Sequence, residues 1–96
     1  MEVLVTYDVS TPDRDGQRRL AKVAAVCERY GERVQYSVFA CRVSNIALFH
    51  LIAELESVID AAADRIDLYR VPGTLAECRT SLGRGVDRDP GQPWFL

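Results

Sequence analysis

The stretch RVQYSVFACRV, residues 33–43, decides the fold of this 96-residue chain. β-branched and aromatic residues are concentrated in it, and such side chains favour extended strands. Neither Gly nor Pro, the residues that most often interrupt a strand, occurs between Arg33 and Val43. Propensity alone therefore predicts one long strand in the middle of the sequence.

The N-terminal segment predicts another strand by strict alternation. One face carries Val3, Val5, Tyr7 and Val9, and the other carries Glu2, Leu4, Thr6 and Asp8. Because Leu4 makes the second face partly apolar as well, we expect this strand in the interior of a sheet. Pro12 follows and ends it, since proline cannot donate to a strand ladder.

Two helices are predicted on either side of the central stretch. The first has Asp15 as its N-cap and Gly31 as its C-terminal stop. Its apolar stripe consists of Leu20, Val23, Ala24, Cys27 and Tyr30. The second is capped by Ser44 and Asn45, and its stripe consists of Leu48, Leu51, Ile52, Leu55 and Ile59.

The C-terminal third carries a weaker pattern. Residues 64–71 predict a strand that Pro72 and Gly73 stop, and residues 78–82 predict a short further strand. Residues 83–96 are rich in Gly, Pro and charge, and they end in Trp94-Phe95-Leu96. We therefore expect a loop and an apolar tail after residue 82.

This order of elements is an α/β layout in which both helices cover one face of the sheet. The opposite face, which includes Leu4 and Thr6, then lacks a cover from its own chain. An apolar face of this kind is typical of an interface, so we expect a homodimer with the tail docked on it. The alternative is a monomer whose tail folds back over the sheet.

The composition excludes several classes of protein. A chain of this length forms one domain, and an apolar content of 48% excludes a mainly disordered one. The N-terminus lacks the basic region of a signal peptide, and the longest apolar run, residues 46–53, is too short to span a membrane. The three cysteines form no Cys-x-x-Cys pair, which argues against a disulfide framework or a structural zinc site. We expect a cytoplasmic protein with no membrane contact, in which the cysteines act as small core hydrophobes and His50 is structural or exposed.

The distribution of charge is more informative than the net charge of −2. Residues 14–42 contain seven basic and three acidic residues, whereas residues 46–67 contain five acidic residues and one arginine. The first segment could meet a phosphate backbone that the second would repel. Both could also be ordinary solvated helix faces.

Three pieces of the sequence together resemble the CRISPR-associated protein two family, the small partner of the CRISPR integrase. They are the strand end VTYDVS at residues 5–10, the helix from Gln17-Arg18-Arg19-Leu20 to Gly31, and the stretch at residues 33–43. The resemblance covers roughly residues 1–71, and residues 33–39 are its most specific part.

The resemblance implies an α+β fold, a ferredoxin-like βαββαβ sandwich that forms a homodimer through the open sheet faces. Residues 33–43 must then bend into two strands near Ser37. An extra C-terminal strand, residues 78–82, would cross to extend the partner's sheet. The domain would thus span residues 1–82, and residues 83–96 would be a loop and tail docking on the dimer.

The resemblance also implies a metal-dependent endonuclease of the adaptation module, which cuts RNA or DNA and acquires new spacers for antiviral defence. Asp8 would be the catalytic residue and the metal ligand, supported by Tyr7, Ser10, Arg33, Ser37 and Phe39. Mg²⁺ needs about six oxygens, so two copies of Asp8 facing each other would share one Mg²⁺, or Mn²⁺ in its place. The alternative is that Asp8 caps its own loop through the amides of Ser10 or Thr11.

The basic residues at the start of the first helix are candidates for nucleic-acid binding: Arg14, Arg18, Arg19 and Lys22. They lie close to the Asp8 loop, and a dimer would present two such groups to duplex DNA or to single-stranded RNA. The expected partners are a second copy, the CRISPR integrase and nucleic acid. Two other functions stay open: a scaffold without catalysis that binds DNA and bridges integrase dimers, and a generic ferredoxin-like dimer that binds a small ligand.

Overall fold

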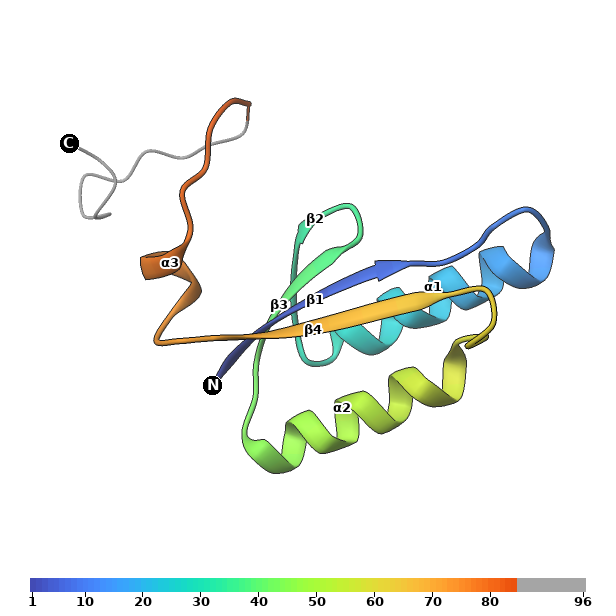
Figure 1. Ribbon diagram of the computed structural model, residues 1–96, viewed down its shortest axis with the longest axis horizontal. Helices are drawn as coiled ribbons and strands as arrows, with labels where there is room; N and C mark the ends of the chain where they lie inside the picture. Colours follow the sequence, from blue (N-terminus) through green and yellow to red (C-terminus); the bar gives the residue numbers. More distant parts are fainter. Residues whose placement is uncertain (85–96) are drawn as a thin grey trace.

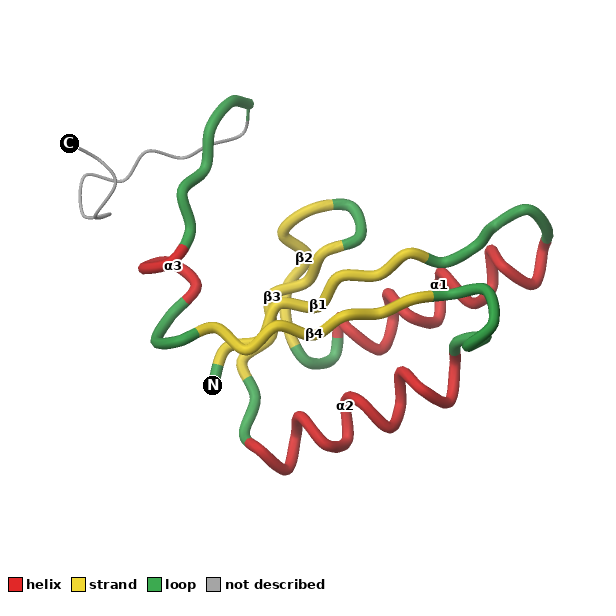
Figure 2. Tube along the Cα trace, in the orientation of Figure 1, coloured by secondary structure: helices red, strands yellow, loops and turns green. Residues whose placement is uncertain are grey.

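A four-stranded antiparallel sheet with both long helices on one face forms the body of the protein in a computed structural model that describes residues 1–84 (Figures 1 and 2). The elements are β1 (Glu2–Asp8), α1 (Arg14–Glu28), β2 (Gly31–Gln35), β3 (Val38–Arg42), α2 (Asn45–Val58), β4 (Arg65–Val71) and a short α3 (Leu75–Cys78). The strand order is β2-β3-β1-β4, so β1 lies in the interior as predicted. The ferredoxin-like βαββαβ fold is confirmed.

The central stretch forms two strands, so the prediction of one long strand from propensity is wrong and the bend near Ser37 is confirmed. The chain reverses at Tyr36 and Ser37, and Arg33 pairs with Phe39 while Gln35 pairs with Val38. This register leaves Val34 as an extra residue, a β-bulge that increases the local twist. No residue other than glycine within 1–84 has a positive φ, so the reversal needs neither Gly nor Pro.

The ends of α1 differ from the prediction. Its N-cap is Asp13, whose carboxylate accepts a hydrogen bond from the amide of Gly16 at 2.9 Å, and Asp15 lies exposed in the first turn. The helix ends at Glu28 with Arg29 as its C-cap, whereas Gly31 begins β2. A Cβ on Gly31 would lie 2.1 Å from the carbonyl oxygen of Ala40. Glycine is therefore required there by the close approach of β3.

The core lies between the sheet and the two helices. Phe39, Leu51, Val3, Val5, Val23, Cys27 and Cys41 are its fully buried side chains. Predicted stripe residues Leu48 and Leu55 are also buried, and Leu20, Ala24, Tyr30, Ile52 and Ile59 pack against the core at its edge. Arg29 and Tyr30 after α1 both bind Glu54 of α2, which joins the two helices at their surface.

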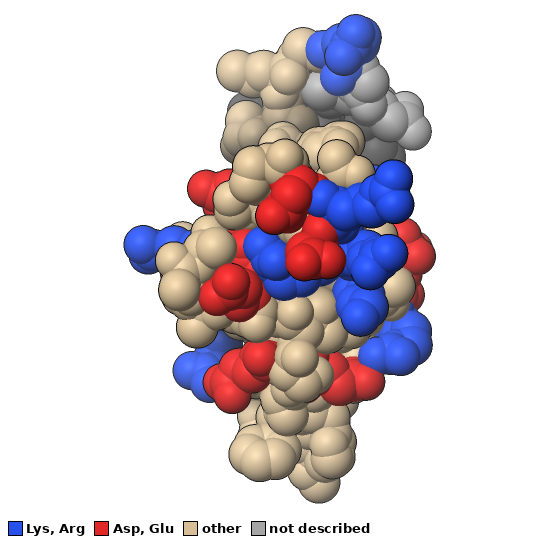
Figure 3. Space-filling model, turned by 90° about the vertical axis from the view of Figure 1, so that its right-hand side faces the viewer, with Lys and Arg blue, Asp and Glu red and all other residues tan. Residues whose placement is uncertain are grey.

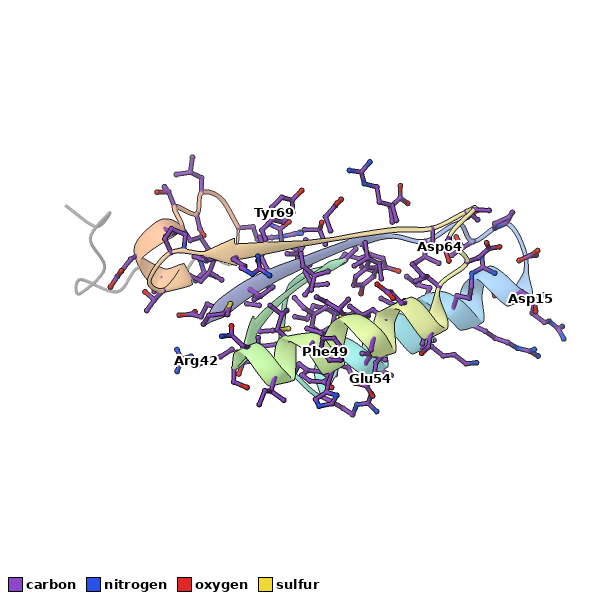
Figure 4. The ribbon with its side chains drawn as sticks, turned by 60° about the horizontal axis from the view of Figure 1, so that its bottom comes forward. Asp15, Arg42, Phe49, Glu54, Asp64 and Tyr69 are labelled. Atoms are coloured by element: carbon purple, nitrogen blue, oxygen red, sulfur yellow. The ribbon has the colours of Figure 1, made fainter. Side chains whose placement is uncertain are left out.

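The face of the sheet opposite the helices carries the even-numbered residues of β1. Leu4 lies opposite Ala40 of β3 and Tyr69 of β4 in the register. Tyr69 is 54% exposed on this face (Figure 4). Part of the face is covered by the chain after β4, where the amide of Leu75 donates to the carboxylate of Glu2 at 3.1 Å. The dimer through this face stays a prediction.

The predicted extra strand at residues 78–82 is not formed in the single chain. Cys78 is the last residue of α3, and no strand is assigned to residues 79–82. A strand exists only where a neighbour completes its ladder, and a strand that extends a partner's sheet needs the partner. The tail at residues 83–96, with Trp94-Phe95-Leu96, lies outside the described residues from position 85 onward.

None of the helices within residues 1–84 combines the length and the apolar character that a membrane crossing requires.

Gly31→Ala should lower the free energy of unfolding by about 2 kcal/mol, because the added methyl group forces β2 and β3 apart. The change is measured by guanidinium denaturation followed by circular dichroism. Glu32→Ala, an exposed substitution one residue further along β2, is the matched control and should cost much less. Equal denaturation midpoints for the two variants would refute the steric role of Gly31.

Candidate functional site

Asp8 is the last residue of β1, and its side chain lies on the open side of the sheet. The register places it opposite Arg65 of β4, and it is exposed. Its carboxylate makes no hydrogen bond or ion pair with any residue in 1–84. The alternative in which Asp8 caps its own loop is therefore not what the structure shows, because the amide of Ser10 donates to Asp64 instead.

One chain does not offer a complete site for a divalent cation at Asp8. Within the described part of the chain, no three residues among His, Cys, Asp and Glu are grouped as metal ligands. Since Mg²⁺ takes about six oxygens in octahedral geometry, one carboxylate leaves most positions to water. The donor set fits a Mg²⁺ or Mn²⁺ ion only if a second copy adds its own Asp8.

Asp64 holds the loop after Asp8 in place. Its side chain is fully buried and accepts hydrogen bonds from the amide of Ser10 at 3.0 Å, the amide of Asp60 at 2.9 Å and Nε of Arg19 at 2.8 Å. Figure 4 shows it between the start of β4 and α1. The carboxylate thus ties the β1–α1 loop to the α2–β4 loop. The sequence analysis counted Asp64 only as an acidic residue, because its partners lie 45 and 54 positions away.

The pKa of Asp64 reflects two opposed effects. Burial raises it, because a carboxylate loses hydration in the core. The hydrogen bonds from Arg19, Asp60 and Ser10 and the guanidinium charge outweigh burial, so the pKa lies below its ordinary value of 3.8. The carboxylate is therefore ionised at neutral pH, and both of its oxygens accept hydrogen bonds.

The four basic residues predicted to bind nucleic acid are not equivalent. Arg19 is only 21% exposed, and its guanidinium also donates to the carbonyl of Ser10 at 3.3 Å. This geometry favours a structural role for Arg19. Arg14, Arg18 and Lys22 are exposed. Among residues 1–84, Arg18 is paired only with the exposed Asp15 at 3.9 Å, a contact of little energetic value.

Acidic side chains accompany these basic ones. Figure 3, which looks at the end of the molecule that carries the β1–α1 loop, shows Lys and Arg interleaved with Asp and Glu rather than one continuous basic surface. The local positive charge predicted for residues 14–42 is therefore divided among small groups of side chains. Any nucleic-acid contact here depends on the individual positions of these side chains.

Three of the residues predicted to support Asp8 meet on the helix-facing side of the sheet. The rings of Tyr7 and Phe39 are stacked with their centroids 6.2 Å apart, and the guanidinium carbon of Arg33 lies 5.1 Å from the Phe39 centroid. Burial raises the pKa of Tyr7, and the charge of Arg33 opposes this. Since successive residues of a strand point to opposite faces, this group supports the end of β1 from behind Asp8.

The other two supporting residues act through the backbone. The amide of Tyr7 donates to the carbonyl of Ser37 at 3.1 Å, which fastens the β2–β3 turn to β1. Ser10 belongs to the hydrogen-bond group around Asp64. These contacts fix the β2–β3 turn and the β1–α1 loop relative to the end of β1.

The remaining candidate residues lie away from Asp8. His50 is exposed on α2 beside Phe49, as predicted for a residue without a catalytic role. Cys27 and Cys41 are buried, and burial raises the pKa of Cys27 to about 12. Cys78 is exposed, so the prediction that all three cysteines are core residues is wrong for this one. Cys78 lies in the C-terminal third of the chain, where the apolar pattern is too weak to indicate a core position.

Comparisons with known proteins agree on one family. The family model of the CRISPR associated protein Cas2 matches residues 1–76. The chain is 49% identical over 71 residues to the CRISPR-associated endonuclease Cas2 of Halalkalibacterium halodurans, with 74% of each chain covered. It is 38% identical over 96 residues to the endoribonuclease Cas2 of Nitratidesulfovibrio vulgaris, covering all of this chain and 94% of that one. Among solved structures, Cas2 of Streptococcus pyogenes superposes with a TM-score of 0.80 at 40% identity, covering 86% of this chain and all of the other.

Asp64→Ala should lower the free energy of unfolding by about 3 kcal/mol at neutral pH, because Ser10, Asp60 and Arg19 lose a shared acceptor. The measurement is guanidinium denaturation. Asp67→Ala is the matched control, since its pair with Arg65 is exposed and should be worth less than about 1 kcal/mol.

The pH dependence has a definite sign. Because the pKa of Asp64 is lowered by folding, its contribution is fully present above the unfolded value of 3.8 and is lost as the pH falls through the folded pKa. The stability gap between wild type and Asp64→Ala should therefore stay constant from about pH 7 to pH 5 and shrink below about pH 4. A gap that is unchanged at low pH would contradict the ionised clamp.

Proposed function

The chain belongs to the Cas2 family of CRISPR-associated endonucleases, and on this premise we propose that two copies form a dimer that hydrolyses phosphodiester bonds of RNA or DNA at their Asp8 residues. The observation that carries the proposal is the exposed, unpaired carboxylate of Asp8 at the end of the central strand. It is the one predicted catalytic residue, and the fold leaves it free while the surrounding loop is fixed by Asp64.

The dimer supplies what one chain lacks. The open face of the sheet carries Leu4, four residues along β1 from Asp8, with Ala40 and Tyr69 opposite it, and burial of such a face by a second copy would stabilise both. A two-fold axis across this face would bring two Asp8 carboxylates to one place. Without a cation the two charges would repel each other, so dimerisation and cation binding would be coupled.

The residues around Asp8 would hold the parts of the site in place. A bound Mg²⁺ or Mn²⁺ would lower the pKa of a coordinated water and stabilise the charge that develops on the phosphodiester. The two Asp8 carboxylates would hold the cation through their oxygens. Asp64 and Arg19 would keep the loop after β1 in a fixed place, and Tyr7 with Phe39 would keep the strand end straight from the core side.

A second role is favoured by the exposed side chains of Arg14, Arg18 and Lys22. They lie in the N-terminal half of α1, which follows the loop after Asp8. In a dimer they would meet a nucleic-acid backbone twice, as a scaffold that holds DNA for the CRISPR integrase during acquisition of new spacers. This role needs no chemistry at Asp8, so the two functions can be separated by experiment.

Asp8→Asn should abolish cation-dependent cleavage of labelled RNA and duplex DNA by the purified protein, because the amide is a far poorer ligand for Mg²⁺ or Mn²⁺ than a carboxylate. Glu56→Gln, an exposed carboxylate on α2, is the control for an equal loss of charge and should cleave like wild type. Cleavage that survives in Asp8→Asn would refute the catalytic role of Asp8 and leave the dimer as a DNA-binding scaffold. Absence of cleavage by wild type would leave the scaffold role alone.

Arg14→Glu/Arg18→Glu should weaken binding to duplex DNA and reduce the slope of log Kd against log salt by about one for each arginine that contacts a phosphate. Arg19 is left unchanged because its guanidinium holds Asp64. Arg70→Glu, at the opposite end of β4 from Asp8, tests whether any charge reversal has the same effect. An unaltered slope in the double variant would remove these two residues from the interface.

A further inference from the structure

A cavity lies between α1 and the β2–β3 turn, on the helix-facing side of the sheet. It has a volume of about 170 Å³ and is here called the turn pocket. It is lined by Tyr7, Gln17, Leu20, Ala21, Ala24, Arg33 and Tyr36. The apolar side comes from α1, and the polar groups are the Gln17 amide, the Arg33 guanidinium and the tyrosine hydroxyls. Tyr7 and Arg33 also support the end of β1 behind Asp8, but the Asp8 carboxylate itself faces the other side of the sheet.

Tyr36 is the most unusual member of this group, because its side chain is 79% exposed at the tip of the turn. Figure 1 shows this turn at the tip of the β2–β3 hairpin. An aromatic ring left in water forgoes the stabilisation that burial would give. The exposed ring is therefore available to a ligand.

The backbone at Tyr36 and Ser37 is fastened to Tyr7 of β1 by two hydrogen bonds. The hydroxyl of Tyr7 donates to the carbonyl of Tyr36 at 3.4 Å, and the amide of Tyr7 donates to the carbonyl of Ser37 at 3.1 Å. A ligand would thus meet a turn that is already in position, which reduces the conformational entropy lost on binding.

Positive charge lies beside the pocket. Arg33 is exposed and is held over the ring of Phe39. Arg14 precedes Gln17 by three positions and Arg18 precedes Ala21 by three, so both arginines lie in the next row of the same helix surface. An apolar pocket with an aromatic edge and a flanking row of arginines is complementary to a nucleobase followed by its phosphates.

We propose that the turn pocket binds one unpaired nucleobase of a single-stranded nucleic acid, with the ring of Tyr36 stacked on the base and Arg33 beside its phosphate. This inference rests on the proposed action on nucleic acid and narrows the substrate to strands with unpaired bases. A duplex hides the faces of its bases, and a base can stack on Tyr36 only where it is unpaired. The cavity is smaller than the roughly 300 Å³ of ordinary small-molecule pockets, so it takes one ring system rather than a whole nucleotide cofactor.

The test is binding of a fluorescein-labelled single-stranded RNA and of a duplex DNA, measured by fluorescence anisotropy in EDTA so that no cleavage occurs. Tyr36→Ala should weaken binding of the single strand about tenfold, the effect of losing one stacked base, and should leave duplex binding within about twofold. Tyr36→Phe should restore single-strand binding, because the ring and not the hydroxyl makes the stack. Arg33→Ala should also reduce the salt slope for the single strand by about one.

Phe49→Ala is the matched control, since Phe49 is 71% exposed on α2 and is not part of the turn pocket. It should bind both probes like wild type. An equal loss of single-strand and duplex binding in Tyr36→Ala, an equal loss in Phe49→Ala, or no loss at all would overturn the proposal. The cleavage assay with Asp8→Asn is independent of these readouts, so failure of the turn pocket and failure of the nuclease function can be told apart.

Discussion

The buried carboxylate of Asp64 is the constraint on which the rest of the candidate site depends. A charge removed from water is tolerated only where hydrogen bonds and an opposite charge replace its hydration. Ser10, Asp60 and Arg19 provide that replacement, and each comes from a different segment of the chain. Satisfying one carboxylate therefore fixes the loop after β1, the start of α1 and the loop before β4 relative to one another. Asp8 is placed by this arrangement although it touches none of these groups.

The alternation of side chains along β1 divides the chemistry of the protein between two surfaces. Tyr7 points into the core side with Phe39 and holds the β2–β3 turn, whereas Asp8 points to the open side. The carboxylate of Asp8 and the turn pocket thus lie at the same end of the sheet but on opposite faces. In the proposed dimer the open faces would be joined and the turn pockets would remain on the outside, where a strand of nucleic acid can reach them.

Membership of the Cas2 family directs attention to the open face and to Asp8. The basic residues of this chain, however, are less available to nucleic acid than the sequence indicates. Arg19, grouped with the nucleic-acid residues on the basis of sequence, has its guanidinium occupied by Asp64 and Ser10. The basic residues that stay exposed are interleaved with acidic ones. In the two roles proposed above, selection of substrate would depend on individual arginines and on aromatic stacking more than on bulk charge.

Signals between neighbouring residues of the sequence were enough to predict several helices and strands. Alternation placed β1, helical spacing found the buried stripes of α1 and α2, and Ser44 capped α2 as predicted. The resemblance carried by residues 5–10, 17–31 and 33–43 supplied the family, the fold and the prediction for Asp8. No local signal marked the turn at Tyr36 and Ser37, which only the resemblance implied. Tertiary structure alone decided the need for glycine at position 31 and the pairing of Arg19 with Asp64. The physical reason is that periodicity depends on neighbours in sequence, whereas a turn without glycine, a close strand approach and a buried ion pair depend on segments that only folding brings together.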